Sequence, residues 1–237
     1  SIGDYDTATK IFKRSLDSFE NDLDREHPIY ARVLNNYVLS FRNTGDPSKL
    51  GAFVAKLEKS LEIHAGSFGS DSPEVAPAHA ALGLVLRDIG GEENLNKAQK
   101  HFMIAYMLNR DYVEENPLRV STDLSNLASV LQELGGTDNQ IRARFILEEA
   151  LDIDEKYFGS NHPVYALHLN NYALILQDLG RIQRQHWLCE SANTKLREAY
   201  RIMLEKYGDQ HPETRKVLET QTPHELGVIP FIPPFFS

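Results

Sequence analysis

Histidine, cysteine and aspartate are the side chains of this sequence that could bind a metal or catalyse a reaction. The chain has nine histidines and one cysteine. His27, His162 and His211 each stand directly before a proline. They lack metal-ligand spacing, so we expect them to cap helices. His79 falls among apolar core positions and is expected to pack there. The remaining histidines that we considered form no ligand motif: His101, His168, His186 and His224.

No catalytic arrangement accompanies these residues. Cys189 has no evident base beside it, and Asp152 and Asp154 should lie on different sides of a helix, on a solvated face. The sequence contains no P-loop, dinucleotide fingerprint, Gly-x-Ser-x-Gly elbow or His-Glu-x-x-His motif. We therefore predict a protein that is not an enzyme and that holds no cofactor and no metal.

The composition excludes several classes of partner. A net charge of −9 argues against binding to nucleic acid or to anionic membranes, which basic patches would attract. No stretch approaches the roughly 20 apolar residues that a membrane-spanning helix needs. A single cysteine rules out an internal disulfide, and no Asn-x-Ser/Thr acceptor is present. We expect a cytoplasmic protein without membrane insertion.

Four glycines, Gly45, Gly90, Gly135 and Gly180, follow one another at intervals of 45 residues. Each closes a similar phrase, such as YARVLNNYVLSFRNTG and YALHLNNYALILQDLG. A fixed period in this range indicates stacked helical units rather than one closed globule. Glycine suits the end of a helix because it readily adopts the left-handed conformation.

The phrase before each glycine predicts a helix. Its apolar positions follow an i, i+4, i+7, i+8, i+11 pattern, which places them on one helix face. One of these positions holds small residues in three of the four repeats, which would allow a neighbouring helix to approach closely. A proline preceded by a polar residue begins each phrase, and that polar residue is expected to cap the helix. The prolines are Pro28, Pro73, Pro117, Pro163 and Pro212.

A second helix is predicted after each glycine, because another set of apolar positions recurs there. We expect an unpaired helix at about 4–22, three helix pairs, a fourth pair whose linker is four residues longer, and a short closing helix from Pro212. No alternating strand pattern competes. The fold class is all-α.

The phrases LNNYALILQDLGR, ALDIDEKYFGSNHP and AKLEKSLEIHAGSFGSDSP resemble tetratricopeptide repeats (TPRs) of the kinesin-light-chain type. The resemblance covers about residues 4–220. It implies a right-handed superhelical solenoid of about five TPR-like helix pairs, in which the first helix of each pair lines a concave groove that binds protein. HEAT and armadillo repeats have periods in the same range, but they lack this turn.

The resemblance also implies which residues line the groove. Helix periodicity places them opposite the apolar positions, and we expect them to be exposed. They are Arg32, Asn35, Asn36, Arg42, Ala81, Leu84, Arg87, Ser125, Asn126, Ser129, Asn170, Asn171 and Leu174.

Asparagine suits such a groove because its amide both donates and accepts hydrogen bonds, as a peptide bond does. An extended ligand could therefore be held regardless of its sequence. Equally, these asparagines could tie adjacent helices together. In the second pair Ala81 replaces asparagine, which with Leu84 would leave an apolar pocket for a ligand side chain.

Arginines 32, 42 and 87 gather in the first two helix pairs, whereas Glu133 lies farther along the chain. One hypothesis is that the groove prefers a peptide whose acidic part lies over these pairs. The alternative is an ordinary solvated face with scattered charges.

Residues 222–237, TPHELGVIPFIPPFFS, differ from the predicted array 1–221, because prolines forbid a helix and the stretch is very apolar. The segment could be a lid on the last helix or an extended ligand for a groove, its own or that of a second copy in a homodimer. The predicted function is a non-catalytic scaffold that binds an extended peptide or a helix of a protein partner. The alternative is a self-assembling or autoinhibited arm of a larger signalling protein, with the tail as its internal ligand.

Overall fold

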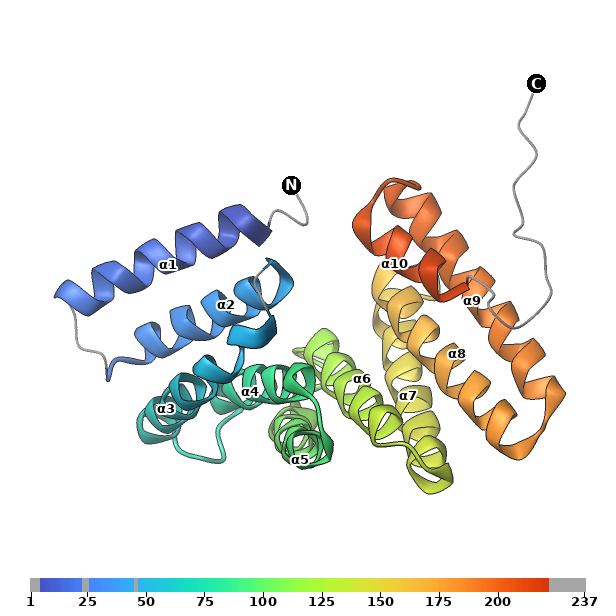
Figure 1. Cartoon of the computed structure of the whole chain (residues 1–237), viewed down its shortest axis with the longest axis horizontal. Coiled ribbons are helices and arrows are strands. Elements are labelled where there is room, and N and C mark those ends of the chain that lie inside the picture. The colour runs from blue at the N-terminus through green and yellow to red at the C-terminus, as the bar shows by residue number, and fades with distance from the viewer. Residues whose placement is uncertain (1–4, 23–25, 45–46, 222–237) are drawn as a thin grey trace. The chain divides into compact units, whose positions relative to one another are not determined.

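The computed structural model describes residues 5–22, 26–44 and 47–221. These residues form ten α-helices and three short 3-10 helices, without a strand among them (Figure 1). The all-α prediction is therefore confirmed. The contacts group into two compact units, Ser1–Ile153 and Asp154–Ser237, and each is described by itself. The expectations for residues 222–237 lie outside the described residues.

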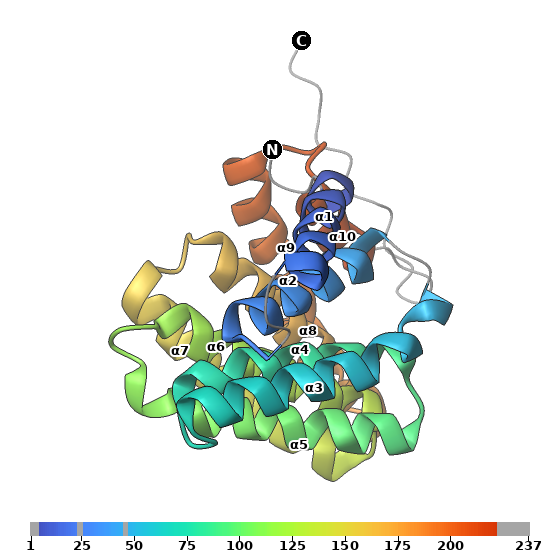
Figure 2. The ribbon, with the colours of Figure 1, turned by 90° about the vertical axis from the view of Figure 1, so that its left-hand side faces the viewer.

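The first unit contains the unpaired helix and the first helix pairs. Neighbouring helices in the chain pack on one another from α1 to α6. In Figures 1 and 2, α4 lies against both α3 and α5, as the contacts require. The helices are α1 (Tyr5–Asp22), α2 (Pro28–Thr44), α3 (Gly51–Phe68), α4 (Ala76–Ile89), α5 (Glu92–Asn109) and α6 (Pro117–Leu134), and the long helix α7 (Thr137–Phe158) continues past the boundary between the units.

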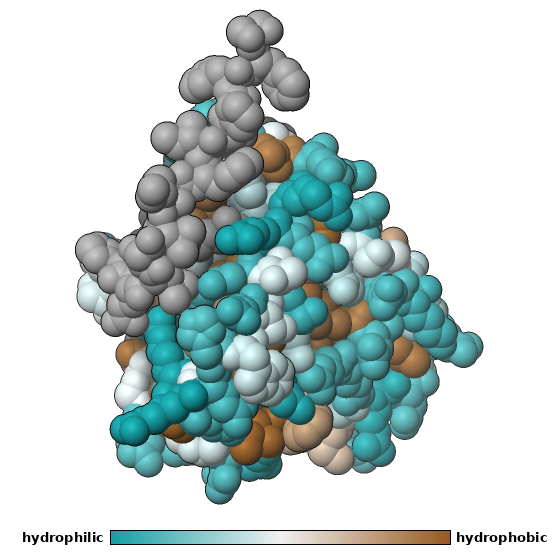
Figure 3. All heavy atoms as spheres, turned by 90° about the vertical axis from the view of Figure 1, so that its right-hand side faces the viewer, coloured by the Kyte–Doolittle hydropathy of each residue, from teal (hydrophilic) through white to brown (hydrophobic). Residues whose placement is uncertain are grey.

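The second unit contains α8 (Pro163–Gln183), α9 (His186–Tyr207) and α10 (Pro212–Gln221). Helix α9 packs on α8, and α10 packs on both. The surface on the right-hand side of Figure 1 is mostly hydrophilic, with several separate apolar areas (Figure 3). No helix of the described residues is long and apolar enough to cross a membrane.

The predicted helix starts are confirmed in most repeats. His27, His162 and His211 each accept a hydrogen bond through Nδ1 from the backbone N–H two residues later. Ser72 does the same through its hydroxyl. Asn116 is the exception, because its side chain makes no capping bond. The histidines therefore satisfy backbone donors that a helix start leaves unpaired.

The predicted glycine stops are confirmed at Gly90 and Gly135, whose φ angles are 74° and 69°. Gly45 lies outside the described residues. The prediction for Gly180 is wrong, because α8 continues to Gln183 and Arg184 takes the left-handed conformation instead, with φ 54°. Gly180 serves packing: a Cβ there would lie 2.6 Å from Sγ of Cys189 on α9.

Small and large residues are matched across the helix pairs. The ring of Phe102 on α5 lies over Gly83 on α4, where an added Cβ would come within 2.8 Å of a ring carbon. The glycine thus makes room for the ring, as predicted for this column. In the next repeat the same two positions hold Ala128 and Leu147. A larger residue at the first position thus goes with a smaller residue at the second.

Candidate protein-interaction surface

The first helices of the first unit form a layer of their own. Helix α2 contacts α4, and α4 contacts α6. Among the described residues, no contact of that extent joins the second helices α3 and α5. Closer spacing on one side means that the first helices lie on the inner side of this unit. This layer is the candidate surface.

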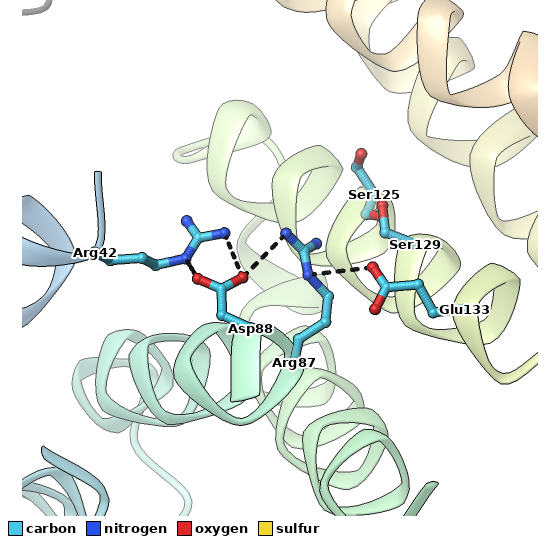
Figure 4. A network of polar contacts seen from close by, with 6 residues as sticks. All are labelled: Arg42, Arg87, Asp88, Ser125, Ser129 and Glu133. Carbon is cyan, nitrogen blue, oxygen red and sulfur yellow. Dashed lines mark hydrogen bonds and ion pairs between the residues drawn. The ribbon is translucent and has the colours of Figure 1, made fainter. Parts of the chain in front are cut away.

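An ion-pair network runs across the layer (Figure 4). Two guanidinium nitrogens of Arg42 on α2 donate hydrogen bonds to the carboxylate of Asp88 on α4. Nε donates to Oδ2, and Nη2 donates to Oδ1 over 3.0 Å. Arg87 of α4 points between two carboxylates, with Nη2 at 3.9 Å from Asp88 Oδ1 and Nε at 3.6 Å from Glu133 Oε1 on α6. The four charges therefore link three successive first helices.

The network is partly removed from water. Burial lowers the pKa of Arg87, and the nearby Arg42 guanidinium lowers it further, whereas the two carboxylates oppose this. Burial raises the pKa of Glu133, with Arg87 acting in the opposite direction. Each group is therefore stabilised in its charged form mainly by its partners.

The acidic-peptide hypothesis needs positive charge that is not already paired, and two of its three arginines, Arg42 and Arg87, lie in this network. Arg42 and Arg87 are balanced by Asp88 and Glu133, so the cluster has no net charge. The expectation of a positively charged surface at Arg42 and Arg87 is therefore wrong. The physical reason is that a carboxylate follows each of these two arginines by 46 residues, one more than the repeat, and so lies on the next first helix. Of the three arginines, only Arg32 lies outside the network.

Four of the residues expected to be exposed are buried. Asn35 is 4 %, Ser125 5 %, Asn170 8 % and Ala81 0 % exposed. Asn35, Ser125 and Asn170 share one repeat position, and exposure was wrongly predicted there because a helix turns by about 100° per residue. Of the adjacent asparagines in an LNN phrase, one therefore points inward while the other points out. Ala81 stands at the repeat position of Asn36, but its short side chain is fully buried, so it cannot line a ligand pocket.

The alternative interpretation of the asparagines is confirmed for the inward members. The hydroxyl of Ser60 on α3 donates to Asn35 Oδ1 over 2.8 Å, which ties α2 to α3. In the second unit Thr220 of α10 donates to Asn170 Oδ1 of α8 over 2.6 Å. These amides satisfy buried polar groups between helices.

The remaining predicted residues lie on the surface of the first helices. Arg32 and Asn36 are exposed, and five others are half-buried: Leu84, Asn126, Ser129, Asn171 and Leu174. Ser129 donates its hydroxyl to the backbone carbonyl of Ser125 over 2.8 Å, which holds it beside the network (Figure 4). Asn171 and Leu174 belong to the second unit.

No family model matches the chain, and no curated protein matches its sequence. Solved structures do match its fold. A kinesin-light-chain-like protein of Podosopora anserina with nearly identical TPR-like repeats superposes with a TM-score of 0.61 at 17% identity, covering 86% of this chain and 90% of that one. A variant of the same protein gives a TM-score of 0.62. BtubC (BKLC) from P. vanneervenii gives 0.60 at 17% identity, covering 89% of this chain and 77% of that one.

This chain has the fold of kinesin-light-chain-like TPR repeats.

Two buried polar pairs occupy equivalent places in successive TPR-like repeats, and neither was predicted from the sequence. Asn109 at the end of α5 donates to Asp123 of α6 over 2.6 Å. One repeat later, Asp154 of α7 bonds to Nδ1 of His168 on α8, also over 2.6 Å. The expectation that Asp154 lies on a solvated face is wrong, because it is fully buried.

A signal for these pairs was present in the sequence. Both are separated by 14 residues, and the second pair lies one 45-residue period after the first. In the preceding repeat the same positions hold His64 and Ala78. The polar residues of the two columns are thus matched in two repeats, whereas His64 is matched by an alanine and its Nδ1 pairs with the backbone carbonyl of Ser60 instead.

Proposed function

We propose that this protein is a non-catalytic scaffold that binds an extended peptide or a helix of a protein partner along its first helices. In the first unit the binding surface is the inner layer of α2, α4 and α6. Its TPR-like fold supports a protein-interaction role. The observation that carries the proposal is that this layer presents polar side chains and Leu84 beside a charge-balanced network that fixes the three helices together.

The chemistry of the surface suits a peptide backbone. Asn36 is exposed on α2 and Asn126 is half-exposed on α6. Each amide can donate to a peptide carbonyl and accept from a peptide N–H. A surface held rigid by the network would lose little conformational entropy on binding. In the second unit, taken by itself, Asn171 and Leu174 of α8 hold the repeat positions of Asn126 and Ser129.

Affinity capture with the full chain tests this function. Bound proteins are identified by mass spectrometry, and affinities for peptides of the captured partner are then measured. Changing Asn36→Ala together with Asn126→Ala should weaken peptide binding by about tenfold, the loss of one to two net hydrogen bonds. The matched control is Lys97→Ala, an exposed change on the second helix α5. Equal binding by all three proteins would remove the surface from consideration.

A further inference from the structure

Helix α10 is a first helix without a second helix of its own in the described part of the chain. It begins at a proline, as α2, α6 and α8 do, and packs on α8 and α9 (Figure 1). Pro212 follows Pro163 by 49 residues, which is the period of 45 plus the four residues of the longer linker. Helix α8 is covered by its own second helix, α9. Within the described residues no helix follows α10 to cover it in the same way.

The side of α10 that faces the preceding pair is packed as in the other repeats. One repeat earlier, this contact contains the bond between His168 and Asp154. Forty-nine residues later the same positions are Val217 of α10 and Met203 of α9, which are 1 % and 0 % exposed. Thr214 also donates its hydroxyl to the backbone carbonyl of Met203 over 3.3 Å. Helix α10 is therefore docked on the preceding pair as a regular first helix.

Leu218 of α10 occupies the position at which a first helix meets its own second helix. At the equivalent positions the other first helices hold Leu34, His79, Leu124 and Leu169. His79 shows the direction of this position, because its Nδ1 lies 2.9 Å from Nδ1 of His101 on α5, the second helix of its pair. The three leucines are 4 %, 1 % and 0 % exposed, whereas Leu218 is 41 % exposed. The described residues therefore leave an apolar side chain uncovered where a second helix would pack.

The segment that follows α10, residues 222–237, is apolar but cannot supply a regular second helix. Four prolines lie within its 16 residues, and proline breaks the interior of a helix. Its large apolar side chains include Val228, Ile229, Phe231, Ile232, Phe235 and Phe236. The apolar face at the end of a repeat array requires a cover. This segment has the apolar side chains that such a cover needs.

We propose that residues 222–237 fold back across α10 in extended form and cover Leu218 in place of a second helix. The ten residues of α10 are about 15 Å long, and the five extended residues 228–232 span about 17 Å. Because the segment begins four residues after Leu218, it stays tethered at an effective concentration of the order of millimolar, and a separate protein would have to compete with it. This contact closes the end of the array and goes beyond the proposed scaffold function.

Photo-crosslinking of the full chain tests which segment covers Leu218. A diazirine analogue of leucine is placed at position 218, and at position 118 as a control, because Leu118 on α6 is likewise exposed, at 48 %. Protein labelled with nitrogen-15 is mixed with unlabelled protein before illumination, so that peptide masses separate links within one chain from links between two chains. Position 218 should link to residues 228–236 of the same chain, and position 118 should not. Links only between chains, or no link from position 218 to this segment, overturn the proposal.

Limited proteolysis is an independent measurement. Chymotrypsin should cleave after Phe231 and Phe235 about fivefold faster in Leu218→Ser than in the parent, because the covered form is then less populated. Leu118→Ser is the matched control and should be cleaved at the parent rate. Thermal unfolding checks that each variant is folded. Equal cleavage rates in folded Leu218→Ser and in the parent would contradict the proposed contact.

Discussion

Asp123 is a carboxyl group held inside the first unit by a single amide. It is 3 % exposed and accepts a hydrogen bond from Asn109, which is also 3 % exposed. Burial raises the pKa of Asp123 to about 6, although the bond from Asn109 and the charge of Arg119 act in the opposite direction. At neutral pH the ionised carboxylate of Asp123 therefore lowers the stability of the folded protein.

The effect of this residue on stability follows from where each state binds its proton. In the unfolded chain Asp123 titrates near its ordinary pKa of 3.8, and in the folded protein near about 6. Between these values the folded state holds the extra proton, so the contribution of Asp123 to the free energy of unfolding falls as pH rises from about 4 to 6. Above that window the loss is complete, with a ceiling of about 3 kcal/mol.

Asp123→Asn should remove this loss while keeping an amide next to Asn109. We expect the variant to be more stable than the parent by about 1–3 kcal/mol at pH 7.5, with the difference vanishing below about pH 4. Urea unfolding at several pH values measures it, with Asp152→Asn on the exposed face of α7 as the control. Parallel stability profiles for parent and Asp123→Asn between pH 4 and 7 would contradict the assignment.

At the scale of helices, the contact of α4 with α5 depends on the missing side chain of Gly83. A helical glycine is usually unfavourable by about 1 kcal/mol relative to alanine. Here the ring of Phe102 occupies the space that a Cβ would need. Close packing of the ring therefore outweighs the backbone preference for alanine. The residue that fits at position 83 depends on the size of the side chain at position 102.

Gly83→Ala should destabilise the protein by about 1–2 kcal/mol, because overpacking exceeds the gain in helix propensity. Phe102→Leu should lower stability by about 1 kcal/mol by leaving a small cavity. The double variant reproduces the combination Ala128 with Leu147, so it should be more stable than the sum of the single changes predicts, with a coupling of about 1–2 kcal/mol. A double-mutant cycle by chemical unfolding measures this coupling, and strict additivity would show that the two residues do not compete for space.

At the scale of the whole molecule, the packing contacts of the described helices join near neighbours in the chain, and they divide into two compact units. In stacked repeats, stability is approximately a sum of local terms between neighbours. Damage in one helix pair should therefore remain local.

Hydrogen exchange followed by mass spectrometry should show this locality. In Gly83→Ala, amides of α4 and α5 should exchange faster, while those of α8 and α9 should exchange as in the parent. The reason is that the overpacked contact lies within the first unit. An equal acceleration in all four helices would mean that the chain opens only as one cooperative body.

The sequence by itself determined the helices, their pairing and the fold class, because the 45-residue period repeats apolar positions that must face a neighbouring helix. It also determined the histidine caps, since a cap acts on a backbone two residues away. The exposure expected of the groove residues was wrong at four positions, because periodicity tells which face a residue lies on but not how deeply a neighbouring helix covers it. Asn35 and Asn170 were misplaced for that reason.

Only the tertiary structure decided which polar groups meet. Asp88 faces Arg42, Asp154 faces His168, and His79 faces His101, each across a boundary between helices. The burial and protonation of such groups depend on which residue of the neighbouring helix contacts them. The sequence of one helix alone does not determine that residue. The repeat period constrained these contacts, but their geometry came from how the helices pack.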